Sequence, residues 1–171
     1  HPQDSSALRK ARGAFFTPAL VARYVTEWAV RSPNDTVLEP SCGEAAFLLE
    51  AGRRLEELGA PSTLAGQLHG AELHAHSAAT AVSLLRARGW EASVSVGDFL
   101  RGEPEAAYDA VIGNPPYVRY QGFAGESRAV AQRAALRAGV ALTSLASSWA
   151  AFTVHAALHV RPGGRLGLVL P

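Results

Sequence analysis

The tetrapeptide Asn114-Pro115-Pro116-Tyr117 carries the most specific chemical pattern in this chain. Two successive prolines fix the backbone and donate no hydrogen bond, so the carbonyl oxygen of Pro115 is held outward beside the amide of Asn114. These two acceptors can bind both hydrogens of an amino group on an aromatic ring. Such an amine is a poor nucleophile, and binding both hydrogens aims its lone pair at an electrophile. We therefore assign catalysis to Asn114, Pro115, Pro116 and Tyr117, although an Asn-Pro-Pro turn can also simply end a strand.

Tyr117 adds an aromatic ring that can stack on a nucleobase. Duplex DNA hides the amino group of a base until that base is flipped out of the stack, and an aromatic face beside the amine acceptors would hold it. No covalent intermediate is required. Methylation of cytosine at C5 instead needs a cysteine nucleophile, normally preceded by proline, and Cys42 lies in a different turn. The pattern therefore predicts group transfer to an exocyclic amine.

Polar residues upstream suit a ligand built from a nucleoside and an amino acid. The turn from Pro40 to Ala45 brings backbone N–H groups close to a carboxylate at the start of a helix. Glu72 can accept hydrogen bonds from vicinal ribose hydroxyls, and Asp98 with Phe99 offers an acceptor and a flat ring to an adenine. The same residues could also form an ordinary turn, a surface glutamate, and a helix-capping aspartate beside a core phenylalanine. Their combination, without a phosphate-binding loop, favours S-adenosylmethionine.

Strands and helices alternate along the chain in a way that can position these residues. Strands are predicted at 36–39, 68–73, 92–96, 108–113 and 165–170, and helices at 19–31, 45–58, 77–88 and 147–160. Thr17 is predicted to cap the first helix, with Pro18 at its first position. Residues 162–164 are predicted to form a turn, and the stretch from residue 118 to about Ser144 shows no clear period.

This alternation predicts an α/β fold, with a Rossmann-like parallel sheet covered by helices on both faces. Ligands bind beyond the carboxyl ends of the strands in such a sheet, near the point where the strand order reverses. Glu39, Glu72, Asp98 and Asn114 stand at or directly after four successive predicted strands. Their common location makes one shared site the expected arrangement.

The composition indicates one soluble domain. Of 171 residues, 48% are hydrophobic and 18% charged, which provides ample apolar surface for a core. No apolar run approaches the ~18 residues that cross a bilayer, and the first residues lack the apolar stretch of a signal peptide, so we expect a cytoplasmic protein without a membrane partner. Cys42 cannot close an internal disulfide. No metal is expected, because satisfied or solvated side chains are the better interpretation of His69, His74, His76, His155 and His159.

Charge is distributed unevenly along the chain. Residues 1–117 carry 10 basic and 14 acidic groups, whereas residues 118–171 carry 6 basic groups and 1 acidic group. A basic segment directly after the tetrapeptide could meet the phosphates of DNA near a flipped base. The candidate contacts are Arg119, Arg128, Arg133 and Arg137. Arginine is also a common solvated surface residue, and both interpretations stay open.

The chain resembles the amino-methyltransferases of DNA modification, especially the adenine-specific class whose cofactor motifs precede the catalytic motif. The matching pieces, in family order, are Phe15-Phe16-Thr17-Pro18, Val37 to Gly43, Glu72, Asp98-Phe99 and Asn114 to Tyr117. The resemblance implies an N-terminal extension at 1–12 and a cofactor-binding and catalytic domain at 13–171. Ala45 stands where the family usually has a second glycine. The chain stops at Pro171, where the family continues with further strands and a target-recognition domain, so we expect a truncated sheet.

The resemblance also implies roles for individual residues. Thr17 and the turn from Glu39 to Ala45 would hold the methionine end of S-adenosylmethionine, Glu72 the ribose, and Asp98 with Phe99 the adenine. Asn114, Pro115 and Tyr117 would hold the target base. The implied cofactor-binding residues are Phe16, Thr17, Glu39, Pro40, Ser41, Cys42, Gly43, Ala45, Glu72, Leu73, Asp98, Phe99 and Asn114.

The implied activity is methylation of the exocyclic amine of adenine in double-stranded DNA, with S-adenosylhomocysteine as the product. A restriction-modification system, with a restriction or specificity subunit or fused domain and a place at the nucleoid, would be the setting. Methylation of glutamine side chains of release factors, of RNA, or of the cytosine amine uses the same chemistry. The motif Phe-Phe-Thr-Pro favours DNA over the release-factor alternative. A non-enzymatic alternative is a DNA-binding subunit that keeps the fold without activity.

Overall fold

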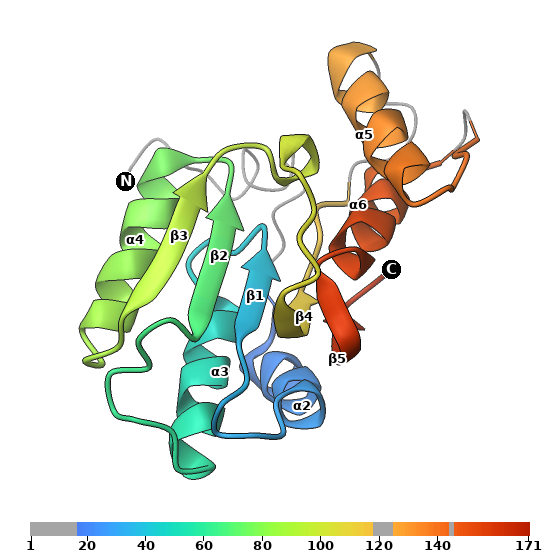
Figure 1. The fold of residues 1–171 in the computed structure, drawn as a ribbon. Coiled ribbons are helices and arrows are strands. Elements are labelled where there is room, and N and C mark those ends of the chain that lie inside the picture. The colour runs from blue at the N-terminus through green and yellow to red at the C-terminus, as the bar shows by residue number, and fades with distance from the viewer. Residues whose placement is uncertain (1–16, 118–124, 144–145) are drawn as a thin grey trace.

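The computed structural model of the chain describes residues 17–117, 125–143 and 146–171, and its central feature is a five-stranded parallel sheet (Figure 1). The strands are β1 (Val37–Pro40), β2 (Leu68–Glu72), β3 (Ala92–Val96), β4 (Tyr108–Gly113) and β5 (Val160–Leu168). The helices are α2 (Ala19–Ala29), α3 (Ala46–Glu57), α4 (Ala75–Arg86), α5 (Gly125–Arg137), α6 (Ser148–Ala157) and the short 3-10 helix η1 (Phe99–Arg101). The predicted α/β fold is confirmed.

Strand β1 is the centre of the sheet, and all four of its residues are buried. The strand order is β3-β2-β1-β4-β5, so the chain moves outward from β1 to β3 and then returns to the other side of β1. Val37 pairs with Leu68 of β2 and with Ala110 of β4. The order therefore reverses between β1 and β4, and a crevice for ligands is expected at the carboxyl ends of these two strands.

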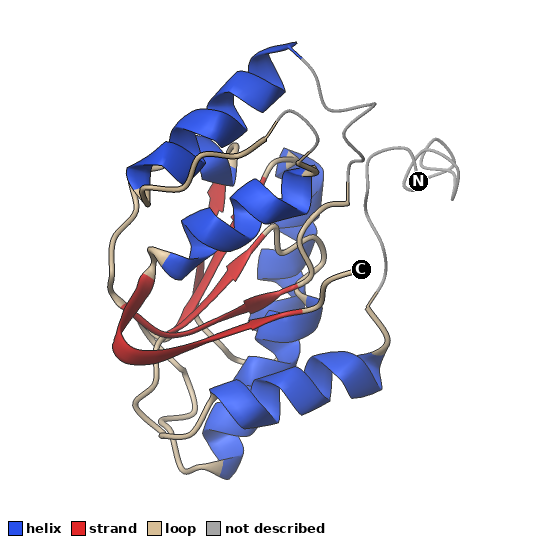
Figure 2. Ribbon diagram, turned by 90° about the vertical axis from the view of Figure 1, so that its right-hand side faces the viewer, coloured by secondary structure: helices blue, strands red, loops and turns tan. Residues whose placement is uncertain are grey.

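Alternate residues of the central strands face two different helix layers. Val37 of β1 and Ile112 of β4 belong to the cluster that includes α2, α3 and α4. Their neighbours Leu38 and Val111 pack instead against Ala156 of α6. Successive side chains of a strand point to opposite faces, so strands buried on both faces must be apolar at nearly every position. Figure 2 shows the helices on both sides of the sheet, as predicted.

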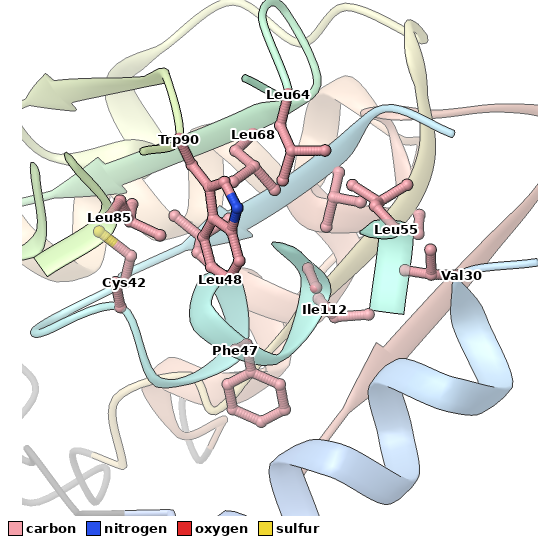
Figure 3. Packing of buried hydrophobic residues seen from close by; sticks show 14 of the residues in the cluster. Val30, Cys42, Phe47, Leu48, Leu55, Leu64, Leu68, Leu85, Trp90 and Ile112 are labelled. Carbon is pink, nitrogen blue, oxygen red and sulfur yellow. The ribbon is translucent and has the colours of Figure 1, made fainter. Parts of the chain in front are cut away.

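Gly52 of α3 lets an indole ring pack directly on the helix backbone. Figure 3 shows Trp90 among the buried side chains of Leu48, Leu68 and Leu85. A Cβ atom added at Gly52 would lie 2.4 Å from Cζ3 of Trp90, which is far inside van der Waals contact. The ring is held in place, because Trp90 is buried and its Nε1 donates a hydrogen bond to Oε1 of Glu56 at 2.8 Å. The absence of a side chain at Gly52 is therefore a packing requirement.

Replacing Gly52 with alanine is expected to lower the free energy of unfolding by about 2 kcal/mol. Overpacking of a filled core costs roughly 1–3 kcal/mol, and the better helix propensity of alanine offsets only part of it. Urea unfolding of the Gly52→Ala variant measures the change. Adding Trp90→Phe should relieve part of the clash, so the double variant should lose less stability than the two single losses combined. A Gly52→Ala variant as stable as the parent would show that the ring does not pack there.

Helix α5 is the largest element that the sequence pattern did not predict. Its buried face consists of one valine and three alanines, Val130, Ala131, Ala134 and Ala135. Small alanine side chains produce little contrast between an apolar and a polar face, so the helical period is weak in the sequence. The helix packs on α6 through a separate small cluster that also contains Leu100 and Phe152.

Strand β5 starts earlier than predicted and contains the residues predicted as a turn. Tyr108 of β4 pairs with Val160, but Ala110 pairs with Arg165, so the register shifts between them. Pro162 and Gly163, with a φ of 79° at the glycine, lie inside this irregular stretch. Proline is tolerated because β5 is an edge strand in the described sheet, and its backbone needs no second partner strand there. The prediction of a turn at 162–164 was wrong, because these residues lie inside β5 at the register shift.

Candidate active site

The turn between β1 and α3 has a left-handed backbone at three of its residues. Ser41, Gly43 and Ala45 have φ values of 61°, 53° and 65°. Ala45 stands where the resembling family usually has glycine, and its fully buried side chain lies at the N-cap position of α3. The left-handed conformation disfavours any residue with a Cβ atom, so the turn stores strain of the kind found at ligand sites. Its backbone N–H groups are brought to the carboxyl edge of the sheet.

Cys42 anchors this turn in the core. Its N–H donates a hydrogen bond to the carbonyl oxygen of Ala71 at 2.9 Å, and its carbonyl accepts one from Ala45 at 2.7 Å. The side chain is buried, and burial raises the pKa of the thiol. A neutral, buried thiol is a packing group and not a nucleophile. This agrees with the exclusion of cytosine C5 chemistry.

Glu39 ties the end of β1 to the start of α3. Its carboxyl group is buried and accepts hydrogen bonds from the backbone N–H groups of Leu48 at 2.9 Å and Phe47 at 3.4 Å. Burial raises the pKa of Glu39 to about 8, even though both hydrogen bonds favour the charged form. Glu39 therefore links the strand before the turn to the first residues of the helix after it.

Glu72 connects the end of β2 to the same turn. Oε2 accepts a hydrogen bond from the N–H of Gly43 at 2.9 Å, and Oε1 accepts one from the N–H of His74 at 2.9 Å. A carboxylate oxygen has more than one lone-pair site, so these bonds leave acceptor capacity for a ligand. Leu73, directly after it, is 59% exposed and is available to cover a ligand at this edge.

Asp98 and Phe99 have structural partners of their own. Oδ1 of Asp98 accepts a hydrogen bond from the N–H of Leu100 at 3.0 Å and caps η1. The ring of Phe99 lies 5.0 Å from that of Phe152 and 4.9 Å from that of His159. These contacts match the alternative of a capping aspartate beside a core phenylalanine. The adenine contact stays a prediction.

An open cavity of about 360 Å³ lies beside Asp98 and Phe99 on the face of the sheet that carries α6. Residues of β2, β3 and the start of β4 also line it, together with His159. Burial and the nearby His155 lower the pKa of His159 to about 4, so its ring is neutral near pH 7. Neither the turn after β1 nor the tetrapeptide after β4 lines this cavity.

The Asn-Pro-Pro-Tyr turn is hydrogen-bonded to three residues from distant parts of the chain. Nδ2 of Asn114 donates to Oγ1 of Thr17 at 3.0 Å, just before α2. Oγ of Ser148, at the start of α6, donates to the carbonyl oxygen of Pro116 at 2.6 Å. The hydroxyl of Tyr117 donates to the carbonyl of Val169, after β5, at 2.5 Å. The conformation of the turn is therefore supported by these contacts as well as by its two prolines.

Two of these supports were missed in the sequence, and one residue has a different role from the predicted one. Ser148 and Val169 carry no local signal, because their partners lie 32 and 52 residues away. Thr17 was predicted to cap α2, but Pro18 occupies the N-cap position and no side chain caps the helix. The hydroxyl of Thr17 instead contacts Asn114 of the Asn-Pro-Pro-Tyr turn, 97 residues away. The role of both residues in cofactor binding stays a prediction.

The candidate DNA-binding arginines are only partly described. Arg119 and Phe16 lie outside the described residues. Arg128, Arg133 and Arg137 lie on α5. Arg137 bonds to the carbonyl oxygen of Gly102 at 2.9 Å and to Glu103 at 2.7 Å. Arg137 thus has partners within the chain, and a phosphate contact by these arginines stays a prediction.

In residues 17–117, 125–143 and 146–171, no three His, Cys, Asp or Glu side chains are grouped as they would be to hold a metal ion. No described helix combines the length and apolar character required to cross a membrane.

Comparison with solved structures defines the class of fold. The chain superposes on the M protein of the type I restriction enzyme EcoKI with a TM-score of 0.67 and 21% identity, covering 92% of this chain and 34% of that one. It superposes on the type IIG restriction endonuclease BpuSI with a TM-score of 0.75 and 14% identity, covering 96% of this chain and 21% of that one. The fold is the Rossmann-like fold of S-adenosylmethionine-dependent methyltransferases.

Sequence comparison defines the family. The profile of the N-6 DNA Methylase family matches residues 4–171, and the chain belongs to this family. The type II methyltransferase M.XamI of Xanthomonas campestris pv. amaranthicola is 34% identical over 113 residues, which cover 63% of this chain and 20% of that protein. M.HincII of Haemophilus influenzae is 24% identical over 159 residues, covering 93% of this chain and 28% of that protein. The chain therefore spans less than a third of the length of either relative.

Proposed function

We propose that the protein containing this chain transfers a methyl group from S-adenosylmethionine to the exocyclic amine of adenine in DNA. The observation that carries the proposal is the Asn-Pro-Pro-Tyr turn at the end of β4, hydrogen-bonded to Thr17 and held by Ser148 and Val169. It stands across the strand-order reversal from the left-handed turn that follows β1. Membership in the N-6 DNA Methylase family supports the same reaction.

The chain offers a suitable set of groups for the cofactor at this edge of the sheet. Backbone N–H groups of the turn from Pro40 to Ala45, at the start of α3, suit the methionine carboxylate. Glu72 has acceptor capacity left for the ribose hydroxyls, and Asp98 with Phe99 would receive the adenine. Phe16 and Leu73 would complete the surroundings. When bound, S-adenosylmethionine supplies an electrophilic methyl group on sulfur, and S-adenosylhomocysteine is left after transfer.

The catalytic turn would act by positioning the target amine. The carbonyl oxygen of Pro115 and Oδ1 of Asn114 would accept its two hydrogens, which directs the nitrogen lone pair toward the methyl group. Tyr117 would stack on the flipped base, and its bond to Val169 fixes its ring. Transfer of the methyl group would form the N–C bond in place of the S–C bond, and the nitrogen would then release one proton to water. Alignment and preorganised acceptors would supply most of the rate.

The setting that we propose is a restriction-modification system acting on double-stranded DNA in the cytoplasm, at the nucleoid. The names of similar proteins, a type II methyltransferase and the M protein of a type I restriction enzyme, support this setting. A restriction or specificity subunit, or a fused domain, would be the partner. The arginines of α5 would meet DNA phosphates.

Replacing Glu72 with alanine is expected to weaken the binding of S-adenosylhomocysteine by roughly 10- to 100-fold, because the variant loses the ribose acceptor and the contact that holds Gly43. Equilibrium titration of the full-length protein measures this affinity. The exposed Glu91, which directly precedes β3, provides the control, and Glu91→Ala should bind the cofactor as the parent does. Equal affinities for the Glu72→Ala variant and the parent would remove Glu72 from the site.

The proposed reaction is tested by identifying its product. The full-length protein is incubated with methyl-labelled S-adenosylmethionine and with DNA, RNA or protein, and each substrate is digested. Labelled N6-methyladenine from DNA is expected. Label in glutamine, in RNA or in the cytosine amine would keep the chemistry and overturn the substrate. Cofactor binding without transfer to any of them would favour the non-enzymatic DNA-binding subunit.

A further inference from the structure

We propose that Thr17 is a positioning residue that orients the amide of Asn114 for catalysis. The inference rests on the proposed function and adds a role toward Asn114 to the cofactor contact that the resemblance implies for Thr17. The structure places Oγ1 of Thr17 3.0 Å from Nδ2 of Asn114, with the amide nitrogen as the donor. The Thr17 hydroxyl does not cap the following helix, since no side chain caps α2.

The orientation of this amide decides whether the site can work. An asparagine side chain has a donor nitrogen and an acceptor oxygen, and rotation by half a turn exchanges them. The proposed mechanism needs the oxygen directed at the target amine. In the opposite orientation the NH2 group would face another NH2 group, and neither could accept a hydrogen bond. The observed hydrogen bond from Nδ2 to Thr17 corresponds to the orientation in which Oδ1 can accept from the target amine.

A hydroxyl can favour one orientation because it has one proton and two lone pairs. When a lone pair of Thr17 accepts from Asn114, the hydroxyl proton is directed elsewhere. An anionic acceptor, such as the carboxylate proposed at the methionine end of the cofactor, would hold that proton. Thr17 could then no longer donate to Oδ1, and the flipped amide would lose its partner. Cofactor binding and amide orientation are thereby linked through one hydroxyl.

The backbone on both sides of Asn114 is held by hydrogen bonds. Asn114 is half-buried and follows directly after Gly113, whose carbonyl oxygen accepts a hydrogen bond from the N–H of Val169 at 2.9 Å. On the other side of Asn114, Ser148 donates a hydrogen bond to the carbonyl of Pro116, and Tyr117 donates one to the carbonyl of Val169. With the backbone held, Thr17 lies within hydrogen-bond distance of the Asn114 side-chain amide.

The test compares Thr17→Val and Thr17→Ser in the full-length protein at saturating cofactor and DNA. Valine keeps the branched shape and removes the hydroxyl, so kcat is expected to fall about 10-fold, the effect of one neutral hydrogen bond. Serine restores the hydroxyl and should bring kcat back to within about 3-fold of the parent. Cofactor affinity is measured separately by titration, so that a loss of binding is not read as a loss of turnover.

Thr26, buried in the following helix α2, provides the matched control. Within the described residues its hydroxyl has no hydrogen-bond partner, and Thr26→Val should leave kcat unchanged. The inference is overturned if Thr17→Val keeps kcat within about 2-fold of the parent, or if Thr17→Ser is as defective as Thr17→Val. If the parent itself makes no N6-methyladenine, the proposed function fails. If the parent is active and Thr17→Val is unimpaired, only this inference fails.

Discussion

Replacing Asn114 with alanine is expected to reduce methyl transfer by roughly 10²- to 10³-fold while leaving cofactor binding within a few-fold of the parent. The amide supplies one of the two acceptors proposed for the target amine, and the carbonyl of Pro115 alone cannot hold both hydrogens. The turn from Pro40 to Ala45 should be little affected, because Gly43 bonds to Glu72 and Cys42 bonds to Ala71, and neither bond involves Asn114.

Single-turnover methyl transfer and cofactor titration on the same preparation separate the two effects. Asn34 provides a control, because it lies exposed in the loop between α2 and β1. Asn34→Ala should retain full activity. Substantial transfer by the Asn114→Ala variant, at more than about a third of the parent rate, would contradict the catalytic assignment.

Replacing Glu39 with glutamine is expected to change how stability depends on pH. Burial raises the pKa of Glu39 to about 8 in the folded protein, whereas an unfolded chain has a value near 4.5. The folded state therefore holds this proton over the range in which the unfolded chain has lost it. Its contribution to stability is fully present below about pH 4.5 and is lost as pH rises through 8, with a total change on the order of a few kcal/mol.

Urea unfolding of the parent and of Glu39→Gln at several pH values between 4.5 and 8 measures this contribution. The stability of the parent should fall relative to that of Glu39→Gln as pH rises, because glutamine carries no titratable proton. Glu91→Gln, at an exposed position, should follow the parent. Parallel profiles for parent and Glu39→Gln would show that the buried carboxyl titrates normally.

The sequence predicted the parts of the fold whose pattern is local. Strands β1 to β4 lie within a residue or two of their predicted bounds, because each is a short apolar run ended by a turn. Helix α5 was missed because alanines form its buried face. The irregular start of β5 was missed because pairing with β4, and not local turn chemistry, decides that Pro162 belongs to a strand.

The candidate site was predictable in its residue types and not in its contacts. Spacing placed Glu39, Glu72 and Asn114 at the carboxyl ends of neighbouring strands, and the topology confirms these positions. The partners of these side chains depend on tertiary packing. Glu72 contacts Gly43 across 29 residues, and Thr17 contacts Asn114 across 97. Such contacts form only in the assembled sheet. The local sequence could therefore indicate Thr17 as a candidate site residue but could not identify Asn114 as its partner.

A crystal structure of the full-length protein with S-adenosylhomocysteine and a DNA duplex containing its target site would test the central claim most directly. We expect an adenine flipped out of the duplex, with its amino nitrogen about 3 Å from both Oδ1 of Asn114 and the carbonyl oxygen of Pro115. The ring of Tyr117 should stack on that base. A flipped base bound away from this turn, or an amino nitrogen held by other acceptors, would contradict the account.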